Sequence, residues 1–330
     1  MPTALVTGGA GFIGSHAVEQ LLAQNYQVRV IDNLIGGRKE NIDLFSENPN
    51  FSFIEDDIRS INLDSSLFKN VDFILHFAGI GDIVPSIQKP EEYMSVNVLG
   101  TVHILEAMRK NDINRMVYAA SSSCYGANPK TPTNEKSDIV TEYPYALSKY
   151  LGETSAFHWS KVYGIEVNSI RIFNAYGTRS RTSGAYGAVF GVFLKQKLEN
   201  KPFTLVGDGK QKRDFVYASD VAKAFILAAQ TNIKGQIWNL GSNNPIEINQ
   251  LVKLLEGPVV NLPKRPGEPD ITWADTSKIE KDLGWKPEVS FESGVAKIVE
   301  NINYWENAPL WDKATIELAT KEWFQFMSKK

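Results

Sequence analysis

Cysteine is nearly absent from this chain of 330 residues, in which Cys124 stands alone. An intrachain disulfide framework is therefore excluded, and a reducing cytoplasm is the expected location. No apolar run reaches the roughly 18 residues that a membrane-spanning helix needs. A glycine-rich turn starts at Gly8, which is too early for a cleavable signal peptide to precede it. We therefore expect no association with a membrane.

An excess of charge of one sign is also lacking. The 35 Lys and Arg residues are interspersed with 38 Asp and Glu residues, for a net charge of −3, so we expect no nucleic-acid partner. The four histidines have no metal-ligand spacing with acids or with Cys124. We therefore expect no catalytic metal, and we expect His76 to pack against a sheet.

Strand patterns alternate with helical patterns through the first half of the chain, with strands expected near 3–7, 27–31, 51–54, 72–77, 115–120 and 166–172. This alternation predicts an α/β fold with right-handed crossovers, a Rossmann-type doubly wound parallel sheet covered on both faces. Residues 1–172 would form this domain, and 214–243 would return to it through a helix at 216–229 and a strand at 237–241. Residues 173–213 and 244–330 would form a smaller α+β substrate-binding lobe.

The stretch Thr7 to Gly14, TGGAGFIG, follows the first strand and opens a helix. Backbone N–H groups at such a turn, together with the helix dipole, attract a diphosphate. Gly8 would allow the turn, Gly11 the approach of a pyrophosphate, and Gly14 the close packing of helix on strand. Asp32 lies 18 residues after Gly14, where a carboxylate binds ribose hydroxyls and repels a 2′-phosphate. The pattern predicts an NAD site, and an ordinary tight turn is the alternative.

Two further stretches follow strands. Asp56-Asp57-Ile58-Arg59 comes after the third strand and would either touch an adenine edge or form a solvated acidic turn. Phe77-Ala78-Gly79 comes after the fourth strand, and its small residues would let the backbone approach the cofactor. Both stretches would lie at the carboxyl edge of the sheet.

The fifth strand runs into Ser121-Ser122-Ser123, whose hydroxyls either satisfy their own turn or donate to a substrate. Pro144 then suits the first turn of a helix, which places Tyr145 and Lys149 four residues apart on one face. An ammonium close by and a positively charged nicotinamide would favour the phenolate of Tyr145. The phenolate could then remove a hydroxyl proton while hydride leaves the same carbon.

Two long helical patterns are apolar around much of their circumference. One covers 90–110, with an interruption near 97–101, and the other covers 145–163. Two such helices on one side of a sheet could pair with their copies in a second subunit as a four-helix interface. We therefore predict a homodimer.

Four motifs, Gly8-xx-Gly11-xx-Gly14, Asn97-Val98-x-Gly100-Thr101, the serine row and Tyr145-xxx-Lys149, occur in an order that resembles the extended short-chain dehydrogenase/reductase superfamily. The resemblance runs from Ala4 to about Leu283 and is greatest to the NAD-dependent nucleotide-sugar epimerases, in particular the UDP-hexose 4-epimerases. It implies an isomerase that acts in carbohydrate metabolism, for example in polysaccharide biosynthesis. Its catalytic residues would be Ser121, Tyr145 and Lys149. The NAD-binding residues that it implies are Gly8, Gly11, Phe12, Ile13, Gly14, Asp32, Asn33, Asp57, Ile58, Phe77, Ala78, Asn97, Tyr145 and Lys149.

The resemblance also implies a site for a UDP-linked sugar. Its residues would be Ser122, Ser123, Asn174, Val189, Phe203, Thr204, Leu205, Arg213, Arg265, Glu268 and Thr272. Asn174 would face the diphosphate, and 203–205 would read a uracil ring. Arg213 would bind phosphate oxygens bidentately, or else form a surface salt bridge. Thr272 is small enough to leave room for an N-acetyl group.

Related 4,6-dehydratases and decarboxylases carry a carboxylate directly after the catalytic Ser or Thr, where this chain has Ser122-Ser123. The absence favours epimerisation at carbon 4 through a transient 4-keto intermediate. A dehydratase, a decarboxylase or a net dehydrogenase is the alternative, and an inactive NAD-binding scaffold is a third hypothesis. Asp82 replaces a Lys of the galactose epimerases and would either disfavour uronic acids or face water. The aromatic tail from Asn301 would dock on the smaller lobe or bind a partner.

Overall fold

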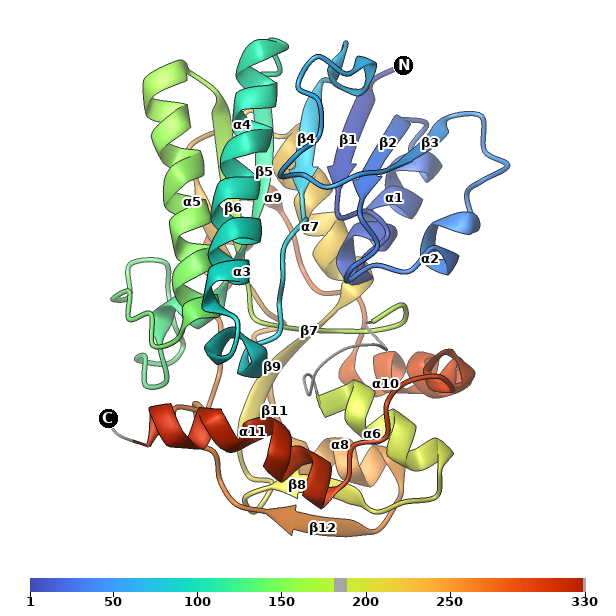
Figure 1. Ribbon diagram of the computed structural model, residues 1–330, viewed down its shortest axis with the longest axis vertical. Helices are drawn as coiled ribbons and strands as arrows, with labels where there is room; N and C mark the ends of the chain where they lie inside the picture. The colour runs from blue at the N-terminus through green and yellow to red at the C-terminus, as the bar shows by residue number, and fades with distance from the viewer. Residues whose placement is uncertain (181–188, 329–330) are drawn as a thin grey trace.

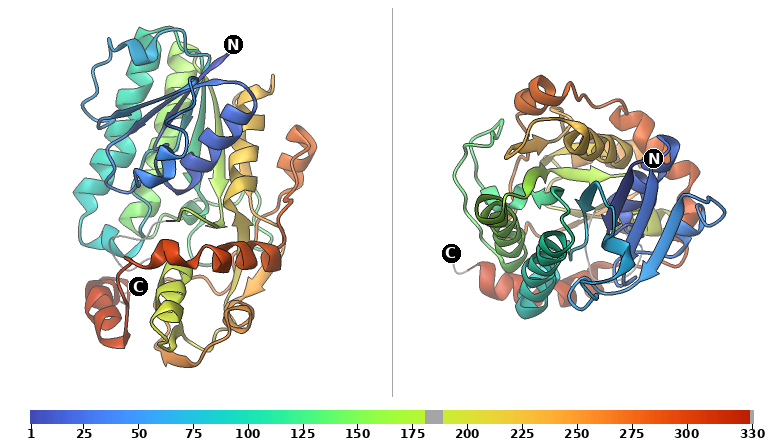
Figure 2. Two further views of the ribbon diagram at one scale, coloured as in Figure 1. Left: turned by 90° about the vertical axis from the view of Figure 1, so that its right-hand side faces the viewer. Right: turned by 90° about the horizontal axis from the view of Figure 1, so that it is seen from above.

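The computed structural model describes residues 1–180 and 189–328. Within these residues, the larger part of the molecule is a parallel sheet between two layers of helices (Figure 1, Figure 2). The seven strands follow the order β10-β6-β5-β4-β1-β2-β3, and every neighbouring pair is parallel. Their bounds are β1 (Thr3–Thr7), β2 (Gln27–Asp32), β3 (Phe51–Glu55), β4 (Phe73–His76), β5 (Arg115–Ser121), β6 (Glu166–Ile172) and β10 (Ile237–Leu240).

Helices cover both faces of this sheet. One layer consists of α1 (Phe12–Ala23) and α7 (Ala218–Gln230), with α9 (Ser277–Leu283) beside α7. The other consists of α3 (Pro90–Met94), the π-helical segment η3 (Ser95–Gly100), α4 (Thr101–Lys110) and α5 (Pro144–Tyr163). The shorter elements are α2 (Glu40–Asp43), η1 (Ser66–Phe68), η2 (Val84–Ile87) and η4 (Ser122–Tyr125).

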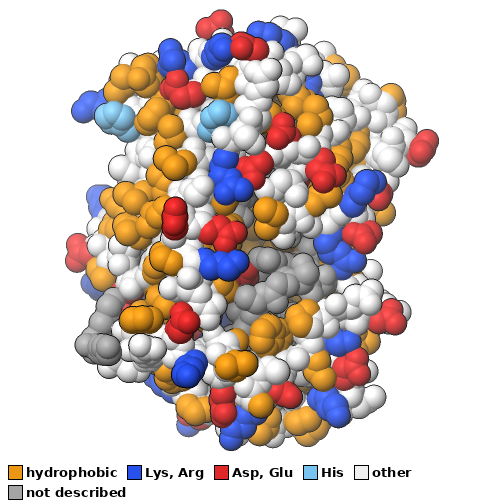
Figure 3. Space-filling view, in the orientation of Figure 1, with side chains coloured by type: hydrophobic (Ala, Val, Ile, Leu, Met, Phe, Trp, Pro, Cys, Tyr) orange, Lys and Arg blue, Asp and Glu red, His pale blue; other side chains and the backbone are white. Residues whose placement is uncertain are grey.

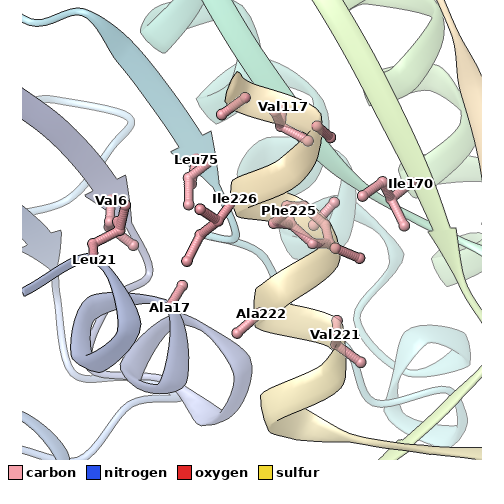
Figure 4. Close-up of a cluster of buried hydrophobic side chains, with 14 of the residues drawn as sticks. Val6, Ala17, Leu21, Leu75, Val117, Ile170, Val221, Ala222, Phe225 and Ile226 are labelled. Atoms are coloured by element: carbon pink, nitrogen blue, oxygen red, sulfur yellow. The ribbon is translucent and has the colours of Figure 1, made fainter. Parts of the chain in front are cut away.

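The strands are apolar at successive positions because both of their faces are buried. Val6 points to the α1 and α7 layer, where it joins Leu21 and Phe225, whereas its neighbour Leu5 joins Leu105 of α4 on the opposite face. Figure 4 shows the first of these clusters, with α7 packed across the sheet beside α1. The alternation of side chains along a strand thus assigns each residue to one layer.

A smaller lobe lies below the carboxyl ends of the strands in Figure 1. It contains a three-stranded sheet in the order β11-β9-β7 and a pair formed by β12 and β8. Helices pack around these strands on a core of large aromatic side chains, among them Phe193, Phe203, Trp305 and Trp323. The elements are β7 (Asn174–Tyr176), α6 (Val189–Leu198), β8 (Phe203–Val206), β9 (Lys212–Tyr217), β11 (Pro245–Glu247), α8 (Ile248–Leu255), β12 (Val259–Leu262), α10 (Phe291–Glu300), η5 (Ile302–Trp305) and α11 (Lys313–Met327).

The parallel sheet with its two helical layers confirms the predicted fold, and the six strands predicted for the first half are present. The helix predicted from Val216 begins at Ala218 instead, because Val216 and Tyr217 pair with β7 as the end of β9. The division of the chain into residues 1–172 with 214–243, and 173–213 with 244–330, stays a prediction. No helix of the described chain is long and apolar enough to cross a membrane.

An ion pair between α5 and β6 is almost completely buried. Arg171 Nη2 lies 2.6 Å from Glu153 Oε2, and the two side chains are 4% and 2% exposed. Ser169 donates to the same carboxylate, and Arg171 donates to the hydroxyl of Tyr125. Each buried charge therefore has an opposite charge and further hydrogen bonds, which offset the cost of removing it from water.

We expect Arg171→Leu to lower the free energy of unfolding by about 3 to 5 kcal/mol, because Glu153 would be left buried without its counter-charge. The control is Lys39→Ala, which removes an ion pair with Asp43 whose side chains are 60% and 51% exposed, and should change the free energy by less than about 1 kcal/mol. Urea unfolding followed by circular dichroism measures both. Equal effects of the two substitutions would contradict the prediction.

Candidate active site

A cleft of about 700 Å³ lies at the carboxyl edge of the parallel sheet, between the sheet and the smaller lobe. Residues that directly follow β1, β2, β3 and β4 line it, together with the last residues of β5, parts of α5 and α6, and the segment before α11. Many residues predicted from the sequence meet there. They are Gly8, Gly11, Phe12, Ile13, Gly14, Asp32, Asn33, Asp57, Ile58, Phe77, Ala78, Ser121, Tyr145 and Lys149.

The turn between β1 and α1 has no room for a side chain at Gly8 or Gly14 and little at Gly11. Gly8 has a φ of +72°, and a Cβ there would lie 2.6 Å from the amide nitrogen of Ala78. A Cβ on Gly14 would lie 2.2 Å from the carbonyl oxygen of Gly8, and one on Gly11 would lie 3.0 Å from the same oxygen. The first turn of α1 has no side-chain cap and no acidic residue. Its N–H groups are therefore available to an anionic group in the cleft.

The acid at the end of β2 is fixed by the backbone around it. Asp32 accepts hydrogen bonds from the amides of Ala10 and Leu34, at 3.0 and 2.8 Å. Burial raises the pKa of its carboxyl group, and these amides act in the opposite direction. The amide of Gly11 is a third donor to this carboxylate, which has about four lone-pair sites, so Asp32 has acceptor capacity left for a ribose.

Asp56 and Asp57, which directly follow β3, line the cleft beside Asp32. Asn33 Nδ2 donates to Asp57 Oδ2 at 2.9 Å, and the guanidinium of Arg59 lies 2.6 Å from the same oxygen. Hydrogen bonds from Arg59, opposed by partial burial, lower the pKa of Asp57 to about 2. The Asp56 to Arg59 stretch is thus an ion-paired turn, and Asp56, Asp57 and Ile58 line the cleft.

His76 lies inside the sheet, as predicted, and is fully buried. Its Nδ1 hydrogen-bonds the hydroxyl of Thr7 at 2.7 Å, its Nε2 hydrogen-bonds that of Thr101 at 3.0 Å, and its ring stacks on Tyr118. Burial, with a smaller contribution from the positive charge of Lys149, lowers the pKa of His76 to about 3. The imidazole is therefore neutral and joins β1, β4 and α4 beneath the glycine turn.

Asn97 lies behind the cleft wall and not in its lining. Its amide accepts from the N–H of Ile80 at 2.8 Å and donates to the carbonyl of Ile80 and the hydroxyl of Ser148. It thereby fixes the loop after β4 to α5. The interruption predicted in the long helix is the π-helical turn that contains Asn97, and such turns are frequent at functional sites.

Ser121 and Tyr145 form the centre of the cleft. Ser121 ends β5, where its hydroxyl accepts from the N–H of Ser123 and hydrogen-bonds Tyr145. Burial raises the pKa of Tyr145, the hydrogen bond with Ser121 lowers it, and the negative charge of Asp82 raises it. Asp82 lines the cleft. Of the serine row only Ser121 lines the cleft, whereas Ser123 hydrogen-bonds Tyr143.

Lys149 lies one helical turn after Tyr145 and is 7% exposed. Its Nζ lies 4.7 Å above the ring centre of Tyr118 and close to the backbone of Gly79. Burial lowers the pKa of Lys149 to about 8, and the charge of Glu153 opposes this shift. The ring of Tyr118 supplies a cation–π contact that the sequence patterns did not reveal.

The substrate-binding residues predicted for the lobe lie at several separate places, whereas those predicted for the sheet side meet in one cleft. Thr272 Oγ1 donates to Asn174 Oδ1 at 2.6 Å, which brings these two side chains together. Phe203, Thr204 and Leu205 form the buried strand β8, and Val189 begins α6, whose next three residues line the cleft.

Three charged residues predicted for the substrate site lie at a second hollow of about 450 Å³ or beside it. Arg213 lies in β9, where its Nη1 donates to the carbonyls of Lys212 and Pro269 at 2.9 Å each. Its predicted contact with phosphate oxygens stays a prediction. Arg265 Nη2 lies 2.5 Å from Glu268 Oε1. Arg213 and Glu268 line the second hollow.

The residues of the cleft fit a dinucleotide. The crowded glycines leave bare N–H groups where a diphosphate would bind, Asp32 is placed for a ribose, and Tyr145 and Lys149 lie at the β5 end of the same cleft. No group of three or more His, Cys, Asp or Glu residues in the described chain is arranged to hold a metal ion.

Comparison with known proteins adds independent information. The model of the GDP-mannose 4,6-dehydratase family matches residues 5–298. A putative UDP-glucose 4-epimerase of Methanocaldococcus jannaschii is 40% identical, covering 89% of this chain and 96% of the relative.

Two solved structures are similar over most of their length. A UDP-N-acetylglucosamine 4-epimerase from Methanobrevibacter ruminantium, in complex with UDP-N-acetylmuramic acid, has a TM-score of 0.85 and 30% identity, covering 93% of this chain and 98% of that one. A UDP-glucuronic acid 4-epimerase from Bacillus cereus, in complex with UDP-glucuronic acid and NAD, has a TM-score of 0.85 and 32% identity, covering 91% of this chain and 99% of that one.

The buried His76 should make stability depend on pH. Its pKa is about 3 when folded, against an ordinary value of 6.5, so between these values the unfolded chain binds a proton that the folded protein does not. The stabilisation is therefore present above about pH 6.5 and is lost as the pH falls toward 3, at about 1.4 kcal/mol per pH unit in the middle of this range.

We expect His76→Gln to reduce the loss of unfolding free energy per pH unit by about 1.4 kcal/mol between pH 6 and pH 5, as measured by urea unfolding. His158→Gln, on the exposed side of α5, is the control and should keep the wild-type slope. Slopes that agree between His76→Gln and wild type would show that His76 does not cause this pH dependence.

Proposed function

The chain belongs to the GDP-mannose 4,6-dehydratase family, and from this premise we propose that it is an NAD-dependent epimerase that inverts carbon 4 of a UDP-hexose. The relatives named as 4-epimerases support this reaction, as does the complex of one of them with NAD. The observation that carries the proposal is the grouping of Ser121, Tyr145 and Lys149 in one cleft with the glycine turn and Asp32.

The side chains of the cleft would act on the sugar as follows. Ser121 hydrogen-bonds the sugar 4-hydroxyl and orients it toward Tyr145, with which it already shares a hydrogen bond. Tyr145, as phenolate, takes the hydroxyl proton while the hydride leaves carbon 4, so that the C–O single bond becomes a carbonyl. The keto sugar turns over, hydride returns to its other face, and Tyr145 gives the proton back to the new 4-hydroxyl. No atom is gained or lost.

NAD, when bound in this cleft, would accept and return the hydride and would bring a positive charge into the cleft that Tyr145 lines. A positive charge would favour the phenolate. Without it, burial and the negative charge of Asp82 both raise the pKa of Tyr145. Lys149, held over Tyr118, adds a second positive charge on the same helix face. The glycine turn and the acid at Asp32 would hold the cofactor, and Asp32 would favour NAD over NADP.

A 4,6-dehydratase is the second candidate, with decarboxylase and dehydrogenase chemistry in the same class. The family takes its name from a dehydratase, and the carboxylate of Asp82 lies close enough to Tyr145 to affect its pKa. Epimerisation is favoured because no carboxylate follows Ser121. On the sugar side, the small Thr272 would admit an N-acetyl group. A cytoplasmic location and a role in polysaccharide biosynthesis stay predictions.

We expect Tyr145→Phe to lower kcat for the interconversion of UDP-glucose and UDP-galactose by about 10²- to 10⁴-fold, since the general base is lost. Tyr26→Phe makes the same change at a half-buried position outside the lining of the cleft, and should leave kcat unchanged. Mass spectrometry of the products separates the candidates, because epimerisation preserves the mass and dehydration removes 18 Da. A mass loss, or no reaction with any UDP-hexose or its N-acetyl form, would refute the 4-epimerase.

We also propose that the protein is a homodimer. Several apolar side chains of η3 and α5 are exposed, namely Leu99 at 64%, Leu147 at 36%, Val162 at 53% and Tyr163 at 50%. Figure 3 shows hydrophobic side chains gathered over α5. Apolar side chains exposed on neighbouring helices are typical of a four-helix interface between subunits.

Leu99→Glu should convert the dimer to a monomer, because two carboxylates would be buried in the interface. Light scattering coupled to gel filtration measures the mass. The control is Leu318→Glu, a change on α11 at a residue that is 74% exposed, which should leave the mass unchanged. A wild-type protein with the mass of one chain would rule out the dimer.

A further inference from the structure

The last part of the chain lies outside the family match, which ends at residue 298. We call residues 304–311 the crossing segment, because they connect the sheet side of the molecule to the lobe. Its first residue is bound to the loop region around α2. Tyr304 donates to Asn41 Oδ1 at 2.9 Å, and the guanidinium of Arg38 lies 4.3 Å above the ring of Tyr304. Asn41 in turn donates to the carbonyl of Ala10 in the glycine turn.

The other end of the crossing segment is bound to α6 in the lobe. Trp305 is fully buried in the core of the lobe. Lys195 donates to the carbonyl of Glu306 at 2.7 Å, and Gln196 donates to the carbonyl of Trp311 at 2.6 Å. Figure 1 shows the chain between α10 and α11 running past α6. The segment is thus held by hydrogen bonds from both parts of the molecule.

Gln196 sets the position of Trp311 relative to β8. The side chain of Gln196 is 1% exposed. Its Oε1 accepts from the N–H of Thr204 at 3.1 Å, and its Nε2 donates to the hydroxyl of Thr204 at 2.8 Å as well as to Trp311. One buried amide therefore joins the crossing segment to the strand that contains three predicted substrate residues.

The crossing segment also lines the cleft. Ala308, Pro309 and Trp311 are part of its lining, together with Phe190 and Val192 of α6. These side chains give the lobe side an apolar surface, whereas the sheet side carries the glycine turn and the polar residues Ser121, Tyr145 and Lys149. An apolar aromatic surface is suited to the faces of a nucleobase or a sugar ring.

We propose that Trp311 is a substrate-binding residue, and that the crossing segment forms a wall of the nucleotide-sugar site. The inference rests on the proposed function for the identity of the ligand, a UDP-hexose. Gln196 is a positioning residue that holds this wall against β8. Trp311 is half-buried: it packs in part against the core of the lobe and also lines the cleft, where a ligand can reach it.

The test is calorimetric titration with UDP and with UDP-glucose, together with steady-state kinetics. We expect Trp311→Ala to weaken UDP-glucose binding and to raise KM by about tenfold, with kcat within about twofold of wild type, because a binding surface is lost and the reacting groups are not. Trp311→Phe retains an aromatic face and should restore most of the affinity. Leu318→Ala, on the same tail but 74% exposed, is the control.

The two ligands distinguish which part of the substrate Trp311 contacts. A loss for both UDP and UDP-glucose places the indole at the nucleotide, and a loss for UDP-glucose alone places it at the sugar. Unchanged affinity and KM in Trp311→Ala, with a melting temperature like that of wild type, would overturn this inference and leave the proposed function intact. If the wild-type protein bound UDP-glucose without inverting carbon 4, the proposed 4-epimerase reaction would be wrong. The role of Trp311 in binding would still be tested by the titrations. A wild type that binds neither ligand would overturn both.

Discussion

The seven strands of the main sheet, within the described residues, run in the same direction, so their carboxyl ends lie at the same edge. This constraint brings together residues that are far apart in the sequence. Gly8 after β1, Asp32 at the end of β2, Ala78 after β4 and Ser121 at the end of β5 all reach one cleft. The backbone after β4 and the first turn of α1 lie so close to the turn after β1 that a Cβ at Gly8 or Gly14 would clash. The chemistry of the cleft depends on this common edge.

Burial and nearby groups have opposite effects on the charged side chains of the cleft. Burial disfavours the charged forms of both Tyr145 and Lys149, since it raises the pKa of the phenol and lowers that of the ammonium. The protein offsets this with the ring of Tyr118 over the ammonium and with the charge of Glu153 behind it. The Glu153 carboxylate is itself held by Arg171. The charge state of Lys149 in the cleft thus depends on an ion pair buried deeper in the same layer.

Much of the sheet side could be predicted from the sequence because its signals are local. The resemblance to the extended short-chain dehydrogenase/reductase superfamily is confirmed by the family match, and the strands, the glycine turn and the helix that bears Tyr145 are encoded in short patterns. A motif gives the position of Asn97 but not the direction of its amide, which in the π-helical turn fixes the loop after β4 to α5. For the same reason the sequence does not reveal the hydrogen bonds of Arg213 to backbone carbonyls. The link from Gln196 to Trp311 joins residues 115 positions apart, and no local pattern encodes such a pair.

The crossing segment has a mechanical consequence. Its contacts with Arg38 and Asn41 on the sheet side, and with Lys195 and Gln196 on the lobe side, link the two sides of the cleft through one stretch of chain. A hinge motion that widened the mouth at this side would break those contacts, so the amplitude of opening is limited by the chain itself. The separation between the sheet side and the lobe side is therefore set by the same segment that lines the cleft.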